Sequence, residues 1–123
     1  MDLLPLLWWL AVGHVVSDFV LQTDFMSQAK DPKQGSTIYY GGIQVSRKRV
    51  GPWWLWMGAH GILNGAVTAL ILGVWWVGPI EALHHACIDW CKCTGRLGFW
   101  ADQLNHAFMK GVLLYLVLNL GGV

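Results

Sequence analysis

Histidine pairs with aspartate or asparagine at a spacing of four residues in four places along a chain of 123 residues. The pairs are His14 with Asp18, His60 with Asn64, His85 with Asp89, and Asp102 with His106. In an α-helix, residues at this spacing lie one above the other on one face. Imidazole and carboxylate groups are common ligands of Zn, Mn and Fe, and helix bundles build such sites from facing helices. The pattern therefore predicts a divalent-metal site.

The expected chemistry of this site is hydrolysis. Seven side chains exceed what one tetrahedral ion needs and could serve two ions. A water molecule bound to such an ion ionises near neutral pH and becomes a nucleophile. Glu81 and Asp24 are both candidate general bases, and the sequence does not decide between them. A phosphate or ester bond in a lipid or lipid-linked substrate would suit this chemistry. The predicted metal ligands are His14, Asp18, His60, His85, Asp89, Asp102 and His106.

The composition is that of a membrane protein. The chain is 55% hydrophobic and 12% charged, and its mean hydropathy is +0.46, which is too apolar for an ordinary soluble domain of this size. Nine Trp residues suit a lipid interface. The net charge of +1 gives no field that would attract a nucleic acid. The composition therefore excludes a disordered chain and a nucleic-acid binder.

Four segments are expected to be helices, and the predicted fold is an all-α, four-helix transmembrane bundle in one domain covering residues 1–123. Leu3 to Gln22 is an apolar run of about the twenty residues that span a bilayer. It has no basic start, so we expect a mature helix and not a signal peptide. Gly58, Gly61 and Gly65 give the second segment a small-residue face for close packing. The predicted helices cover about residues 3–28, 53–77, 79–93 and 97–120.

The polar pairs must face one another inside this bundle. A charged side chain deep in a bilayer costs about 2.5 to 3.5 kcal/mol on insertion scales, so several of them facing lipid would undo insertion. One such pair is more often a satisfied packing contact than a ligand pair. Four pairs at one depth favour a site, because polar contacts between membrane helices contribute only about 0.6 kcal/mol each.

Basic residues predict the orientation, because positively charged loops stay in the cytoplasm. They lie in the first and third connections, so both termini are expected on the non-cytoplasmic side of a bacterial inner membrane. The first connection, residues 31–52, contains two β-rich runs around Gly41 and Gly42, which is typical of a hairpin. It is either a lid or docking surface, with residues 36–49 meeting a protein partner, or a solvated linker. The basic residues are Lys30, Lys33, Arg47, Lys48, Arg49, Lys92 and Arg96.

A second cluster lies on the other side of the third segment. His84, Cys87 and Cys91, with Cys93 beyond them, are of a type that could bind Zn or Cu(I). The spacing is unspecific, and free cysteine is also a common small apolar filler. Three crowded Cys residues argue for reduced thiols and against a disulfide framework. Packing is therefore the favoured interpretation of this cluster.

The stretches from His14 to Asp24, His60 to Asn64, His85 to Asp89 and Asp102 to His106 resemble successive signatures of the domain of unknown function 3307. This family contains small integral membrane proteins of bacteria and their phages. The resemblance covers most of the chain except about residues 31–52, and it implies a helical membrane bundle without an established activity. The family often has a second His on its second helix, where this chain has Asn64. A looser likeness is to membrane-bound metal-dependent hydrolases induced by DNA damage.

Two other function classes stay open. In a transporter or channel, the same polar face would pass protons or metal ions, and the extension of polar residues to Glu81 and Lys110 favours this. In a non-catalytic membrane partner, such as a phage holin or an accessory subunit, the basic hairpin would dock another protein. The oligomeric state is not indicated by the sequence.

Overall fold

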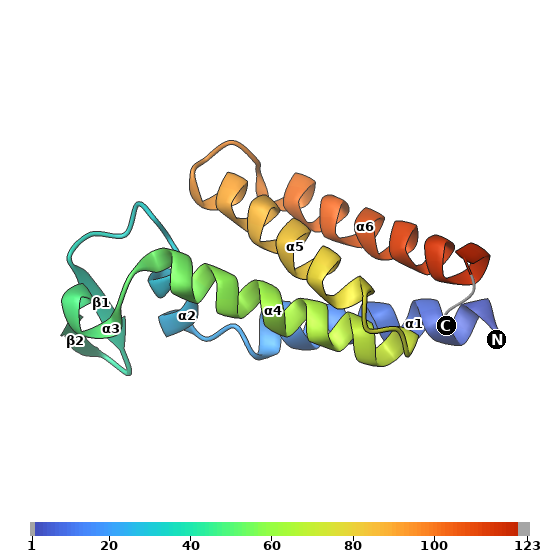
Figure 1. Ribbon diagram of the computed structural model, residues 1–123. Coiled ribbons are helices and arrows are strands. Elements are labelled where there is room, and N and C mark those ends of the chain that lie inside the picture. Colours follow the sequence, from blue (N-terminus) through green and yellow to red (C-terminus); the bar gives the residue numbers. More distant parts are fainter. Residues whose placement is uncertain (1, 121–123) are drawn as a thin grey trace.

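The computed structural model describes residues 2–120, which form long helices lying side by side and a small hairpin at one end (Figure 1). The fold is mostly helical, with β1 and β2 paired as a small antiparallel sheet. In chain order the elements are α1 (Leu3–Val15), the π-helix η1 (Val16–Val20), α2 (Asp24–Ala29), β1 (Thr37–Tyr40), β2 (Ile43–Ser46), α3 (Arg47–Val50), α4 (Trp53–Leu72), α5 (Val77–Cys93) and α6 (Phe99–Leu120).

The first helix differs from the continuous helix expected over residues 3–28. α1 runs directly into η1, whose wider π-type turn accommodates an extra residue in the helix. The chain then leaves the helix, and α2 begins where the Thr23 hydroxyl accepts the backbone N–H of Met26 at 3.2 Å. As a result Ser17 and Asp18 are both buried on η1, although they are neighbours in the sequence.

The connection between the second and third helices also differs from the expected bounds. α4 ends at Leu72, and not at residue 77, because Gly73 adopts the left-handed conformation (φ 68°) that commonly terminates a helix. α5 begins at Val77, two residues before Pro79, which lies in its first turn, where proline is tolerated. The last helix begins at Phe99, after a turn in which Gly95 has φ 80°.

α4 and α5 pack closely through small residues. A Cβ atom on Gly61 would lie 2.6 Å from the carbonyl oxygen of Ala82, and one on Gly65 would overlap the carbonyl oxygen of Gly78. This confirms the predicted small-residue face at those two positions. Gly58 has no atom of a neighbouring element within 4 Å of its Cβ position, so it is not part of the contact. The close approach sets the polar faces of α4 and α5 against each other.

The interior divides into an apolar end and a polar end. The apolar core lies where α1, α4, α5 and α6 meet far from the hairpin, near both ends of the described chain (Figure 1). The opposite half of the helix bundle contains the buried polar and charged side chains. The residues of the apolar core are Leu10, Leu72, Val74, Val77, Leu113, Leu114 and Val117.

The predicted hairpin is present. Tyr40 pairs with Ile43, and Gly41 and Gly42 form the two-residue turn with φ values of 55° and 80°, which glycine adopts without strain. Ile38 is fully buried. The Arg47 guanidinium donates to the carbonyl oxygens of Ala29 at 2.9 Å and Gln34 at 3.3 Å. The first connection is therefore a packed hairpin and not an extended linker.

Within residues 2–120, two segments are long and apolar enough to cross a membrane: Leu3–Val20 and Trp53–Leu72. α5 has 17 residues, a rise of about 26 Å, and contains Glu81 and Asp89. α6 has 22 residues but includes Asp102 and Lys110. Length and composition thus support membrane-crossing helices for two of the four segments expected to span.

Candidate metal centre

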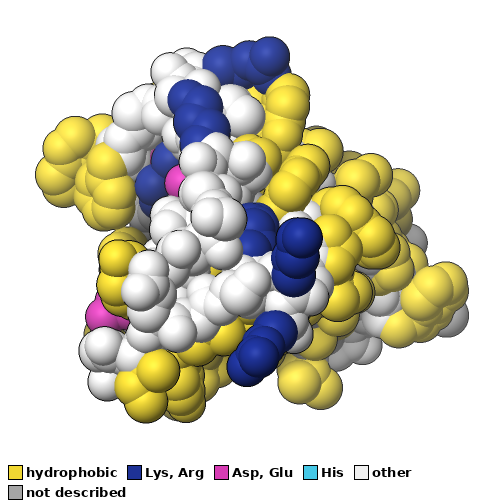
Figure 2. All heavy atoms as spheres, turned by 90° about the vertical axis from the view of Figure 1, so that its left-hand side faces the viewer, with side chains coloured by type: hydrophobic (Ala, Val, Ile, Leu, Met, Phe, Trp, Pro, Cys, Tyr) yellow, Lys and Arg dark blue, Asp and Glu magenta, His cyan; other side chains and the backbone are white. Residues whose placement is uncertain are grey.

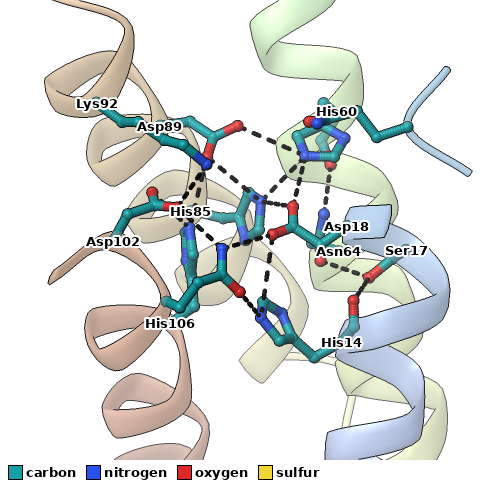
Figure 3. Close-up of polar contacts among 12 residues, drawn as sticks. His14, Ser17, Asp18, His60, Asn64, His85, Asp89, Lys92, Asp102 and His106 are labelled. Atoms are coloured by element: carbon teal, nitrogen blue, oxygen red, sulfur yellow. Dashed lines mark hydrogen bonds and ion pairs between the residues drawn. The ribbon is translucent and has the colours of Figure 1, made fainter. Parts of the chain in front are cut away.

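The polar faces of α1–η1, α4, α5 and α6 point at one another, and their side chains form a single cluster (Figure 3). The structure places the side chains of all seven predicted ligands in this cluster, but His14 belongs to neither of the groups whose atoms could hold a metal ion. His14 is the least buried, with 12% of its side chain exposed. The other six are at most 5% exposed: Asp18, His60, His85, Asp89, Asp102 and His106.

Four of these residues form the centre of the cluster. Asp18 Oδ1 lies 3.0 Å from His60 Nε2 and 3.2 Å from His85 Nε2, and the two Nε2 atoms are 3.2 Å apart. Asp89 Oδ2 lies 3.5 Å from His60 Nε2. One ligand atom from each of the four residues lies within 4.8 Å of the other three. They come from three different parts of the chain, on η1, α4 and α5.

These distances are compatible with a metal site as well as with a network of hydrogen bonds. Four ligand atoms at about 2.0–2.1 Å from a tetrahedral ion lie about 3.3–3.4 Å from one another. Without an ion, hydrogen bonds from both Nε2 atoms to Asp18 Oδ1 would place two N–H groups 3.2 Å apart, whereas a single such bond leaves the other Nε2 with a lone pair. A central cation would accept all of these lone pairs.

A second group of possible ligands consists of Asp89, Asp102 and His106. His106 Nε2 lies 3.3 Å from Asp102 Oδ1 and 3.5 Å from Asp89 Oδ1, and its ring stacks on His85 with 3.9 Å between centroids. Two ammonium groups already neutralise these carboxylates. Lys30 donates to Asp89 Oδ2, and Lys92 Nζ lies 2.7 Å from Asp102 Oδ2. The charge balance therefore favours one divalent ion over two.

Gln103 links His14 to the cluster. Its side-chain nitrogen donates to Asp102 Oδ2 at 2.9 Å and to Asp18 Oδ2 at 3.3 Å, and its oxygen lies 3.0 Å from His14 Nε2. His14 Nε2 itself is 4.0 Å from Asp18 Oδ2. His14 thus lies at the edge of the cluster, next to a carboxylate of the central group.

Asn64 has a packing role in this arrangement. Its side-chain oxygen accepts the Ser17 hydroxyl at 2.5 Å, and its side-chain nitrogen donates to the backbone oxygen of His60 at 3.2 Å. The first bond holds η1 against α4, and the second lies within α4, so both polar atoms of the amide are used. The amide is not directed at the central group, in agreement with its weak ligand character.

The structure brings neither candidate general base to the ligand atoms. Glu81 is fully buried and lies 2.5 Å from Lys110 Nζ, and its Oε1 faces His85 Nδ1 at 4.0 Å, on the side of the ring away from the centre. Asp24 is exposed at the start of α2. In the part of the chain described, no group that could hold a metal includes either residue, nor His84, Cys87, Cys91 or Cys93.

Sequence reasoning missed the residues that compensate and orient the ligands: Ser17, Lys30, Lys92 and Gln103. Lys30 and Lys92 were interpreted only as signals of orientation. The charge of the cluster itself could have identified them, because three buried aspartates require nearby cations. Gln103 lies one residue after a predicted ligand, and only the geometry shows that its amide reaches both Asp18 and Asp102.

No family model, curated protein or solved structure matches the chain. The resemblance to the domain of unknown function 3307 therefore stays a prediction, and the cluster has to be interpreted from its own geometry.

Proposed function

We propose that this protein is a metal-dependent hydrolase of a bacterial inner membrane, with its site near the cytoplasmic leaflet. The observation that supports this most directly is the set of ligand atoms from Asp18, His60, His85 and Asp89, which are buried and lie within 4.8 Å of one another. A divalent Zn, Mn or Fe ion suits these imidazole and carboxylate donors. When bound, such an ion would supply a nucleophilic hydroxide near neutral pH.

The membrane setting is supported by the outer surfaces of the helices. Large apolar side chains are exposed on all four long helices, including Leu4 (78%), Leu70 (82%), Leu83 (70%) and Phe108 (71%). Charged side chains of α5 and α6 face inward, which would reduce the cost of placing these helices in lipid. We therefore propose four membrane-spanning helices, with both termini on the non-cytoplasmic side.

The surface around the hairpin supports an anionic substrate. Lysine and arginine side chains gather on the end of the molecule that carries the hairpin, where few acidic side chains are seen (Figure 2). Lys48 and Arg49 are exposed there. A positive surface attracts anionic lipid headgroups, at about 1 kcal/mol for each basic residue. We therefore propose a phosphate or ester bond of a lipid as the target.

His14 is our proposed proton carrier, in place of Glu81 and Asp24. It is the least buried imidazole of the cluster, and its Nε2 lies 4.0 Å from Asp18 Oδ2. The contact with Gln103 holds the ring in place at 3.0 Å. Because the Gln103 oxygen accepts from Nε2–H, the proton of the attacking water would be received at Nδ1, which has no hydrogen-bond partner among the described residues, and returned from there to the leaving group.

Elemental analysis of the purified protein in detergent tests the proposal, with His84 and His85 as a matched pair on α5. We expect about one transition-metal ion per chain in the wild type and in His84→Ala, and loss of the ion in His85→Ala. His84 is half-buried and outside the ligand groups, whereas His85 is a central ligand. Phosphate release from phosphatidic acid, dependent on the added metal, would identify the activity. A wild-type protein that binds no metal, with unchanged folding after Asp18→Ala or His106→Ala, would remove the proposal.

Proton or metal-ion transport is the second candidate, favoured by the Glu81–Lys110 pair. This pair is buried farther from the hairpin than the central group and extends the polar interior toward the apolar end. Protein in sealed liposomes distinguishes the two candidates. A hydrolase should leave an imposed proton or metal-ion gradient intact, whereas a transporter should dissipate it, and Glu81→Gln should slow that flux.

A further inference from the structure

α1 and α6 leave a groove between them on the outside of the bundle. Its volume is about 320 Å³. Leu7, Ala11 and Val15 form one wall, and Ala107 and Gly111 form the other. The small residues keep the groove open, because nothing lies within 4 Å of a Cβ position built on Gly111. Alanine and glycine on facing helices thus produce a narrow, mostly apolar channel along the helix axes.

The groove leads to the metal centre. His14 and Lys110 are the polar residues of its lining. His14 Nε2 lies 4.0 Å from Asp18 Oδ2, one of the carboxylates of the central group. Lys110 is 6% exposed, and its ammonium is held by Glu81. A molecule in the groove would therefore have apolar contacts along its length and an imidazole of the cluster at its side.

Another groove of the molecule lacks this connection. The larger one between α4 and α5 has about 540 Å³ and is lined by apolar residues such as Ile62, Ala66 and Trp75. It reaches none of the cluster residues. The α1–α6 groove thus combines an apolar wall with access to the site.

We infer that the α1–α6 groove holds one hydrocarbon chain of the anionic lipid that the protein hydrolyses. This inference rests on the proposed function. This arrangement fits the two parts of a lipid. The basic end of the molecule attracts the anionic headgroup, and the groove, which runs from His14 away from that end, receives the hydrocarbon chain. Leu7 lies seven positions before His14, which gives a rise of about 10 Å toward the proposed bilayer centre. In the proposed topology, a lipid of the cytoplasmic leaflet also has its headgroup at the basic end and its hydrocarbon chains toward the bilayer centre.

Photo-cross-linking tests the groove without requiring turnover. The protein is reconstituted in vesicles of phosphatidylethanolamine and phosphatidylglycerol, with a small fraction of phosphatidylglycerol carrying a diazirine in one acyl chain. We expect cross-links concentrated in residues 7–15 and 107–111. Gly111→Leu should fill the groove and reduce them several-fold. Gly58→Leu is the matched control, since Gly58 is also a helical glycine with open space at its Cβ position but lies on α4.

The outcomes separate the groove from the chemistry. Cross-links spread evenly over the outer faces of α1, α4, α5 and α6, or an equal loss in Gly58→Leu, would overturn the inference. Gly111→Ala fills less of the groove and should give a smaller loss, and it keeps the test valid if Gly111→Leu does not fold. His85→Ala should retain the cross-links, because the groove does not need the metal. A protein that cross-links as expected but hydrolyses no lipid would refute the proposed function alone.

Discussion

At the scale of single residues, charge compensation decides how the cluster is built. Of the three buried aspartates, Asp89 is paired with Lys30 and Asp102 with Lys92, whereas Asp18 contacts imidazoles and Gln103. With neutral imidazoles, this leaves one uncompensated negative charge. A divalent cation or one protonated imidazole would offset it. The cluster therefore attracts cations even before any ligand geometry is considered.

Lys30→Met should destabilise the protein. Lys30 is 5% exposed and paired with Asp89, and breaking a buried ion pair by removing one partner costs about 3–5 kcal/mol. Thermal unfolding in detergent would measure the loss, and an added divalent metal should restore part of it by compensating Asp89. Lys33→Met is the control, because Lys33 is exposed and should change stability by no more than about 0.5 kcal/mol. Equal effects of both variants would contradict the buried pairing.

The clustering of the histidines and aspartates was predictable from the sequence, whereas the lysines that pair with the aspartates were not. Spacing of four residues on a helix identifies a shared face, and the high cost of charge in lipid turns that face inward. Lys30 reaches Asp89 across 59 positions of sequence, through a bend after η1 that no periodicity indicates. Long-range pairing of this kind depends on the packing of whole helices.

At the scale of elements, the π-helix η1 and the small residues of α4 position the site. η1 directs both Ser17 and Asp18 inward, so that one binds Asn64 and the other enters the central group. Gly61 and Gly65 let α5 approach α4 closely. The hairpin was predictable from its turn glycines, since Gly41 and Gly42 have the positive φ values that such turns require. The break after η1 was not, because no proline or glycine lies between Asp18 and Ala29 to mark it.

Gly65→Ala should loosen the α4–α5 contact. Its new methyl group would overlap the carbonyl oxygen of Gly78, and overpacking of this kind costs about 1–3 kcal/mol. Gly58→Ala, on the same helix, meets no neighbour and should stabilise the helix by up to about 1 kcal/mol. Thermal unfolding of both variants in one detergent provides the comparison. A Gly65→Ala protein as stable as Gly58→Ala would show that the two helices are not in close contact.

At the scale of the whole molecule, an apolar core at one end and a polar cluster at the other divide the helix bundle. The polar end is also the end with the hairpin and the concentration of basic side chains (Figures 1 and 2). Two helices have the length and composition of membrane spans. α5 and α6 do not meet this criterion, because their buried polar residues lower the mean hydropathy of both helices.

Cysteine labelling should establish the orientation in the membrane. In a variant with Cys87, Cys91 and Cys93 replaced by alanine, single cysteines are introduced as Ser46→Cys in the hairpin and Trp75→Cys between α4 and α5. Both positions are exposed. An impermeant maleimide added to intact spheroplasts should label the Trp75→Cys protein and leave the Ser46→Cys protein unlabelled until the membrane is opened. The opposite pattern would invert the proposed topology.

The buried pairing of Lys30 with Asp89 also constrains how the chain is made. Synthesis makes Lys30 before Asp89 exists, so in the proposed membrane topology the ammonium of Lys30 lacks its ion-pair partner while α1 and α4 are being inserted. Only the arrival of α5 completes the pairing, and α6 then adds Asp102 beside Lys92. In the proposed four-helix topology, completion of α5 and α6 is thus the step at which these buried ion pairs can form, and a chain that stops earlier leaves Lys30 without Asp89.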